Sequence, residues 1–308
     1  MKHHSRWRHG LPSCGQRPVR PRNRANSLLT EGVFDTNIDT SREGRVAVAL
    51  WREWRAMLHD LQKVGPVWSI VRNERSVLAV QGNYPELTFS ADERTARAVR
   101  GDSSLLYQFD AWRQAVACDT RCCCGRVYGV EFGNRYGDIF HKVCLAKGTE
   151  LSAFIDWTQV HQATGLELPI AAEVENREGR SLFNPLPAPG TLLLPAHLLR
   201  TVLICATERE IPLEVAVSAE GLTQTARMEI TRASESHGWL VFSSQNRSLY
   251  VESEPAEWLR VEPGMLEGES IWMLSLVDEE GRCHLRVHTG LDTLDAWNRL
   301  VQERVLVT

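Results

Sequence analysis

The amino-acid sequence predicts an α+β protein made of two repeated domains, each a large antiparallel sheet with flanking helices. Short apolar runs alternate with polar residues on both sides of turns that contain Gly and Asn, which is typical of antiparallel hairpins. Segments with apolar residues at helical spacing open and close each half of the chain. A chain of 308 residues is long enough for two domains of ordinary size, each with its own core.

An internal repeat supports the division into two domains. Tyr128–Leu145 reads as a hairpin and Leu151–Val160 as a helix, and this unit recurs in Ile271–Val301, where Gly281 lies 144 residues after Gly137. A second echo has an offset of 146 and links Gly65–Val67 with Ile211–Leu213. Two echoes in the same order with nearly equal offsets indicate a duplication of whole domains rather than a solenoid.

The composition is that of a soluble globular protein, with 43% hydrophobic and 24% charged residues and a formal net charge of −4. That balance gives no reason to expect nucleic acid or an anionic membrane as a partner. No apolar run approaches the roughly 20 residues that span a bilayer, and the N-terminus has no apolar core of the kind that a secretory signal requires. We therefore expect a cytoplasmic protein without membrane insertion.

Eight cysteines are compatible with a reducing compartment, and four of them cluster at Cys118, Cys122, Cys123 and Cys124. One interpretation of the cluster is a zinc or redox site. Structural zinc sites usually have a second ligand pair at a defined spacing, and none is evident here. Adjacent cysteines on a strand also point to opposite faces. We favour a cysteine-rich loop without a metal, and the metal or redox role stays the alternative.

Residues 1–44 are expected to form a disordered basic tail. Lys2 and six arginines precede the first acidic residue, Glu31, and the apolar residues show no period. Such a segment cannot bury enough apolar surface to offset the entropy of ordering it. The alternative interpretations are a basic arm for nucleic acid and a targeting peptide.

The first repeat is expected at residues 45–165. It opens with a helix from Arg45 that ends at Gly65-Pro66. A run of antiparallel strands follows, and the hairpin and helix of the repeated unit close the domain. The expected strands are Val67–Val71, Ser76–Val80, Leu87–Phe89, Thr95–Val99 and Leu105–Phe109, with Trp112–Val116 as a strand or a short helix.

Residues 166–194 change in character, because Pro and Gly recur between Pro169 and Gly190, and we interpret them as a linker. The second repeat, residues 195–308, then opens with a helix from Pro195 to about Glu210. Its expected strands are Leu213–Val217, Leu222–Ile230, Trp239–Phe242, Ser248–Val251 and Trp258–Val261, before the repeated hairpin and helix.

Four segments of the chain have sequences similar to those of a known family: Val64–Glu74, Gly137–Val143 with its adjacent His and Lys, Glu210–Val217, and Gly281–Leu300. Together they resemble the HemS/ChuX haem-utilisation (hemin-degrading factor) family over about Trp51–Val301. The long members of that family are also internal duplications. The resemblance implies a pair of large antiparallel sheets with helices at their ends and a haem between the two halves.

The resemblance also implies a function: a cytoplasmic protein that binds haem or a related tetrapyrrole and passes it on for haem uptake and iron utilisation, with ring opening in some members. The implied partners are the haem-uptake machinery or a haem-receiving protein. The chain departs from the family in two places. The family's axial histidine lies in a Thr-Asp-x-His-x-Phe helix before the second repeat, where this chain has the linker. No arginine near Leu105–Phe109 matches the family's haem-contacting arginine. A divergent non-haem binding or interaction module on the same scaffold is therefore the alternative.

A haem site needs an axial donor, cations for the two propionates and an apolar wall. The axial donor that we expect is His197, because it lies closest in sequence to the family's ligand position. His161 could face the same cleft, and His141 matches the family phrase but shares a strand face with apolar residues. The hairpin residues His284 and His288 are expected on the surface. The cationic candidates are Arg72, Arg113 and Lys142, since Arg in particular can bind a carboxylate with two parallel hydrogen bonds.

No catalytic residues can be named from the sequence. It contains no P-loop, no Gly-x-Gly-x-x-Gly after a strand, no Gly-x-Ser-x-Gly and no His-Glu-x-x-His motif. Enzymatic activity, including haem degradation, therefore rests on the family resemblance alone.

Overall fold

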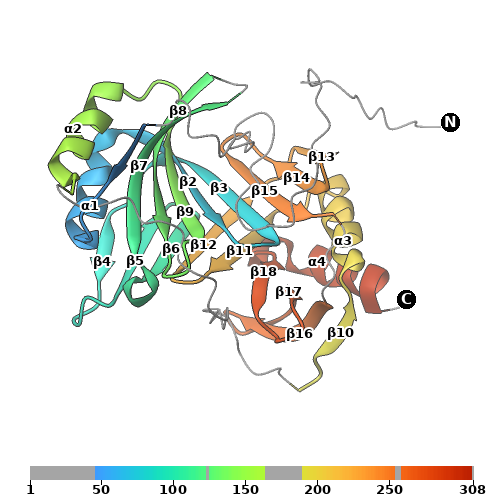
Figure 1. Ribbon diagram of the computed structural model, residues 1–308. Helices are drawn as coiled ribbons and strands as arrows, with labels where there is room; N and C mark the ends of the chain where they lie inside the picture. Colours follow the sequence, from blue (N-terminus) through green and yellow to red (C-terminus); the bar gives the residue numbers. More distant parts are fainter. Residues whose placement is uncertain (1–45, 123–124, 164–188, 254–257, 307–308) are drawn as a thin grey trace.

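The computed structural model of the protein describes residues 46–122, 125–163, 189–253 and 258–306. In these residues the chain forms two nine-stranded antiparallel sheets with two helices beside each (Figure 1). The first half contains β1 (Val46–Ala49), α1 (Trp54–Leu61), β2 (Pro66–Arg72), β3 (Ser76–Asn83), β4 (Leu87–Phe89), β5 (Thr95–Arg100), β6 (Ser103–Gln108), β7 (Gln114–Cys122), β8 (Gly125–Gly133), β9 (Ile139–Leu145) and α2 (Leu151–His161).

The second half repeats this order of elements, which confirms the duplicated α+β architecture that the sequence predicts. It contains β10 (Leu192–Pro195), α3 (His197–Glu208), β11 (Leu213–Ala219), β12 (Leu222–Met228), β13 (Arg232–Ser236), β14 (Trp239–Ser243), β15 (Arg247–Glu252), β16 (Trp258–Leu266), β17 (Glu269–Val277), β18 (Cys283–His288) and α4 (Leu294–Val301). No helix in the described part of the chain is long and apolar enough to cross a membrane.

The strand orders show that the two halves exchange strands. The first sheet has the order β1-β7-β8-β9-β2-β3-β15-β14-β13, and the second has β10-β16-β17-β18-β11-β12-β6-β5-β4. Three strands of the second half thus join the first sheet through β15, where Leu249 pairs with Leu78. Three strands of the first half join the second sheet through β6, where Leu105 pairs with Gln224. The sequence boundaries between the repeats stay a prediction, and the sheets do not follow them.

The hydrophobic core lies between the two sheets. Alternate residues of β2 and β3, such as Val71 and Leu78, belong to one buried cluster with Val215 and Leu222 of β11 and β12, and these strands of the two sheets lie against each other. The helices cover the remaining parts of these inner faces, with α1 and α2 beside the first sheet and α3 and α4 beside the second (Figure 1). We call the opposite side of each sheet its outer face.

Several predicted elements have different boundaries in the structure. The helix expected from Arg45 begins at Trp54, because Val46–Ala49 is extended and pairs with β7. Likewise, Leu192–Pro195 at the end of the predicted linker is a strand paired with β16, and the helix begins only at His197. The sequence analysis also missed β13, which lies at an edge of the first sheet. The basic tail and most of the linker lie outside the described residues.

Candidate functional site

Three polar side chains form a row across the outer face of the second sheet. Arg260 on β16 pairs with Ser275 on β17, and Ser275 pairs with Arg286 on β18. Their chain neighbours, such as Leu259, Leu274 and Val287, point to the inner face and are fully buried. Because side chains alternate along a strand, the three polar groups share the opposite side of the sheet. We call Arg260, Ser275 and Arg286 the arginine row.

The arginine row places two guanidinium groups on either side of a small hydroxyl side chain. Arg260 is 2% exposed and Ser275 is fully buried, whereas Arg286 is half-buried. The carboxylate of the buried Glu262 lies 3.6 Å from the Arg260 Nε. A guanidinium that is removed from water needs anionic or hydrogen-bonding partners, and a carboxylate suits its planar fork. Arg286, the half-buried member of the row, is the one that an acidic ligand could reach.

Exposed apolar side chains flank the arginine row on the same face. Leu193 of β10 pairs with Arg260 and is 58% exposed, and Trp258, two residues before Arg260, is 46% exposed. Towards the opposite edge of the sheet, Leu106 of β6 and Val99 of β5 are also exposed on this face. Polar and apolar groups arranged in this way match a flat ligand that has a large apolar surface and acidic substituents.

His288 lies on β18 two residues after Arg286, so its side chain projects from the same outer face. Its Nδ1 lies 2.9 Å from the carbonyl oxygen of Thr289. A carbonyl only accepts, so Nδ1 carries the proton and Nε2 carries a lone pair. This is the usual arrangement of a metal-ligating histidine, whose second ring nitrogen is fixed by a backbone or carboxylate acceptor. Glu214 of β11 pairs with His288. Burial raises the pKa of the Glu214 carboxyl, and the charges of His288 and Arg227 oppose this rise.

The equivalent row of the first sheet neutralises itself. Glu131 of β8 and Lys142 of β9 occupy the places of Ser275 and Arg286, and their side chains form a buried ion pair of 3.0 Å. Burial lowers the pKa of Lys142, but Cys144 and Glu131 raise it above its ordinary value. Burial lowers the pKa of Arg72, and Glu131 and Asp138 act in the opposite direction. Lys142 and Arg72 are thus neutralised within their own sheet.

His141 is fully buried between aromatic side chains. Its Nδ1 donates to the carbonyl oxygen of Ile70 at 2.9 Å, and its Nε2 lies 3.1 Å from the hydroxyl of Tyr84. The ring stacks on Phe132 with a centroid distance of 5.4 Å. Burial lowers its pKa to about 4. His141 is therefore a hydrogen-bonded core histidine, as the strand alternation predicts.

The remaining predicted site residues lie in separate surroundings. His161 ends α2 and is buried, with its Nε2 3.2 Å from an oxygen of Asp60. His197 is exposed at the first position of α3. Arg113 is exposed too, and its guanidinium donates to the carbonyl oxygens of Asp110 and Trp112. The structure thus does not assemble one site from His197, His161, His141, Arg72, Arg113 and Lys142.

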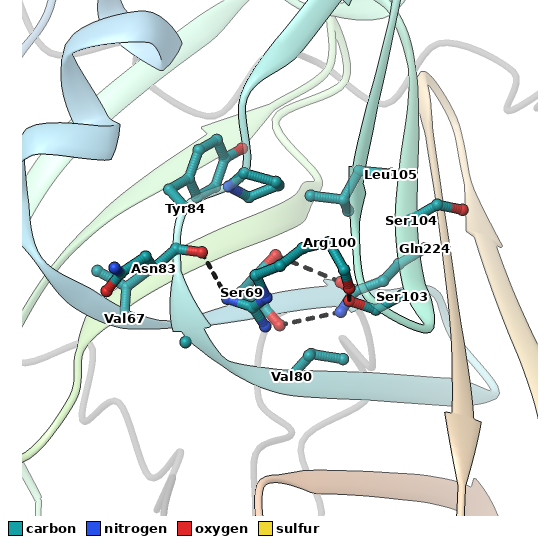
Figure 2. A pocket seen from close by; sticks show the side chains of 12 residues that line it. Val67, Ser69, Val80, Asn83, Tyr84, Arg100, Ser103, Ser104, Leu105 and Gln224 are labelled. Atoms are coloured by element: carbon teal, nitrogen blue, oxygen red, sulfur yellow. Dashed lines mark hydrogen bonds between the residues drawn. The ribbon is translucent and has the colours of Figure 1, made fainter.

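A small pocket lies where the two sheets meet (Figure 2). The space inside it is about 10 Å³, on the order of one water molecule, and it is partly open to solvent. Ser69 donates to the Gln224 side-chain oxygen at 3.4 Å, and Gln224 donates to the Ser69 carbonyl at 3.3 Å. Arg100 donates to the carbonyl oxygens of Gln81 and Asn83. A porphyrin does not fit this pocket.

Within the described ranges, no three His, Cys, Asp or Glu side chains gather in a way that could hold a metal ion. Cys118, Cys144 and Cys283 are buried. Cys123 and Cys124 lie outside the described residues, so the alternative metal or redox role of the cysteine cluster stays a prediction.

Comparison with known proteins finds a family model that is similar to the first half of the chain. Residues 34–161 match the family model described as the haemin-degrading HemS.ChuX domain. The first half of the chain is thus similar to this domain. Over 123 residues, 40% of this chain, it is 27% identical to the hemin transport protein HmuS of Yersinia pestis, and the match spans 35% of the length of that relative.

Two solved structures show that the HemS/ChuX fold extends to the second half as well. Holo-PhuS, a heme-binding protein from Pseudomonas aeruginosa, matches with a TM-score of 0.72 and 17% identity over 84% of this chain and 86% of its own. ChuS, a heme oxygenase of E. coli, matches with a TM-score of 0.70 and 14% identity over 84% of this chain and 89% of its own. The architecture of two large antiparallel sheets is common to all three.

Proposed function

We propose that this protein binds haem or a related tetrapyrrole on the outer face of its second sheet, as part of cytoplasmic haem uptake and iron utilisation. The HemS/ChuX domain and the fold shared with a heme-binding protein support the ligand class. The observation that carries the proposal is the arginine row with its exposed apolar neighbours. The expected partners are the uptake machinery or a protein that receives the haem.

The residues on this face fit the chemistry of the ligand. Arg286, which is half-buried, would hold a propionate by charge-assisted hydrogen bonds, and Trp258 and Leu193 would cover part of the porphyrin plane. Bound haem would supply an iron atom with open axial positions. The sequence analysis missed both arginines because isolated arginines on strands have no motif. Their signal is the alternation of Arg with fully buried residues on two strands.

We propose His288 as the axial ligand, because it projects from the same face as the arginine row and has its Nδ1 fixed by a carbonyl. His197, which the sequence predicts as the ligand, is exposed and stays the second candidate. His161 is the third, but its ring is buried and faces Asp60. Ring opening is not part of the proposal, since no described residue supports it.

The first prediction concerns the arginines. Arg286→Ala should weaken haem binding by about 10- to 100-fold, because one charge-assisted hydrogen bond contributes roughly 1.5–3 kcal/mol. Titration followed at the Soret band measures the loss. Arg200→Ala is the matched control, since Arg200 lies on α3 with an exposed partner, Glu235. Equal affinity of the Arg286→Ala and Arg200→Ala variants would contradict the proposed site.

The second prediction concerns the axial ligand. His288→Ala should change the Soret and visible bands of the haem complex, because the iron loses its imidazole, whereas His161→Ala and His197→Ala should leave the bands as in the unmodified protein. Absorbance and electron paramagnetic resonance spectra of the three variants measure the outcome. A ligand change in His197→Ala and none in His288→Ala would place the iron elsewhere.

A second candidate function is a non-haem binding module, which the departures from the family's ligand motif favour. The arginine row would then hold another flat carboxylic acid. A haem spectrum without a saturable, shifted Soret band would support this candidate.

A further inference from the structure

A chain of three buried side chains runs from the pocket at the sheet junction into the core. Tyr84 lines the pocket, and its ring lies beside the pocket in Figure 2. Its hydroxyl oxygen is 2.7 Å from that of Tyr107 and 3.1 Å from the Nε2 of His141. Tyr84 is 3% exposed, and Tyr107 and His141 are fully buried. The haem proposal uses none of these groups.

The directions of these hydrogen bonds follow from one fixed acceptor. The carbonyl of Ile70 can only accept, so the Nδ1 of His141 donates to it. The Nε2 of the neutral ring then accepts, and Tyr84 must be its donor. With its own proton used, the Tyr84 oxygen accepts from the hydroxyl of Tyr107. Tyr84 is therefore a buried phenol that is hydrogen bonded to a nitrogen base.

We infer that Tyr84 and His141 form a proton-coupled redox site. The phenol of Tyr84 gives one electron to an external one-electron oxidant, and its O–H bond breaks as the proton moves to the Nε2 of His141. The products are a neutral phenoxyl radical, an imidazolium and the oxidant reduced by one electron. The return of one electron moves the proton back to the Tyr84 oxygen.

Burial forces the electron and the proton to move together. It raises the pKa of Tyr84 and of Tyr107, so neither phenol loses its proton to water beforehand. The same burial keeps the imidazole of His141 neutral near pH 7, with its pKa lowered to about 4. The Ile70 carbonyl, which faces Nδ1, favours the charged ring once it forms.

Aromatic rings connect this site with the surface. Trp54, half-buried at the start of α1, lies 5.6 Å from Trp112 between ring centroids, and Trp112 lies 5.8 Å from Tyr107. Rings at such distances are close enough to pass an electron in steps. Haem that has reacted with peroxide is one source of a suitable oxidant, and this link alone rests on the proposed function. The redox site itself does not depend on haem.

The test uses the whole protein without haem and a trivalent ruthenium polypyridyl complex, generated by a laser flash, as the oxidant. Electron paramagnetic resonance and transient absorbance should show a tyrosyl radical that forms more slowly in D₂O. Tyr84→Phe should remove this radical. Tyr107→Phe should keep it and shift its g value, because one hydrogen bond to the radical oxygen is lost. The control variant Tyr136→Phe, at a half-buried position away from this site, should change nothing.

His141→Gln should slow radical formation by about 100-fold or more, since a positioned base contributes on the order of 10²–10⁴. Unchanged formation in His141→Gln, equal rates in H₂O and D₂O, or an unchanged radical in Tyr84→Phe would overturn the inference. If Tyr84→Phe fails to fold, the spectrum of the unmodified protein decides. In that case, the g value of the tyrosyl radical should be shifted by the hydrogen bond from the charged His141 ring. A g value without this shift would contradict the site.

Discussion

At the scale of single residues, the surroundings of a histidine decide its role more than its place in a motif. His141 matches a family phrase and is nevertheless a core residue, because both ring nitrogens are used inside the protein. This could be predicted from the alternation of its strand. The role of His288 could not, because its fixed Nδ1 depends on the conformation of Thr289 at the strand end.

The buried neutral state of His141 predicts a pH dependence of stability. Its folded pKa of about 4 lies below the ordinary value of 6.5. Between these values the unfolded chain binds a proton that the folded protein does not, so stability rises with pH across the window and is lost as the pH falls. A shift of this size corresponds to about 3 kcal/mol.

Urea unfolding at several pH values from 7.5 to about 4 checks this prediction. The free energy of unfolding should fall less steeply with acidification in His141→Gln than in the unmodified protein. His59→Gln, at an exposed position of α1, should retain the full slope. Parallel slopes in all three proteins would show that His141 does not control the acid response.

At the scale of secondary-structure elements, long patterns were predicted more reliably than short ones. The hairpins and the closing helices follow clear periods and have the expected positions. The four-residue strands β1 and β10 were interpreted as a helix start and a linker, because a short apolar run does not distinguish strand from helix. Pairing of β1 with β7 and of β10 with β16 decides their conformation. Each partner strand lies far away in the sequence.

The exchange of strands between the two sheets also could not be predicted from local sequence patterns. Alternation specifies which face of β6 or β15 is buried, and it does not specify which neighbouring strand completes the hydrogen bonds. The arginine row has the same origin. Arg260 and Arg286 lie 26 positions apart in the sequence, and only the β16-β17-β18 register brings them to one row.

At the scale of the whole molecule, the exchange makes the two halves depend on each other. Removal of the second half would leave β3 without β15 and β6 without β12. The fragment of residues 45–165 should therefore not fold as a monomer. Two copies could pair through the exposed strands in the same way as the two halves of the chain, so its folding should depend on concentration. Circular dichroism and analytical ultracentrifugation over a dilution series measure this, and a folded monomer would refute the expectation.

The two repeats also differ in the side chains at equivalent positions of their sheets. The first sheet has the internally neutral pair Glu131–Lys142 at the positions where the second sheet has Ser275 and Arg286. Both sheets retain the fold, and only the second has two arginines, Arg260 and Arg286, in this row. We interpret the first repeat as the structural partner and the second as the binding repeat, with one ligand per chain.

The most direct test of this account compares the binding of haem and of its dimethyl ester to the unmodified protein and to Arg286→Ala. The account predicts that the unmodified protein binds the free acid at least about tenfold more tightly than the ester, which is the effect of roughly one charge-assisted hydrogen bond. This preference should shrink in Arg286→Ala. Equal affinities for acid and ester in the unmodified protein would contradict the proposed role of the arginine row.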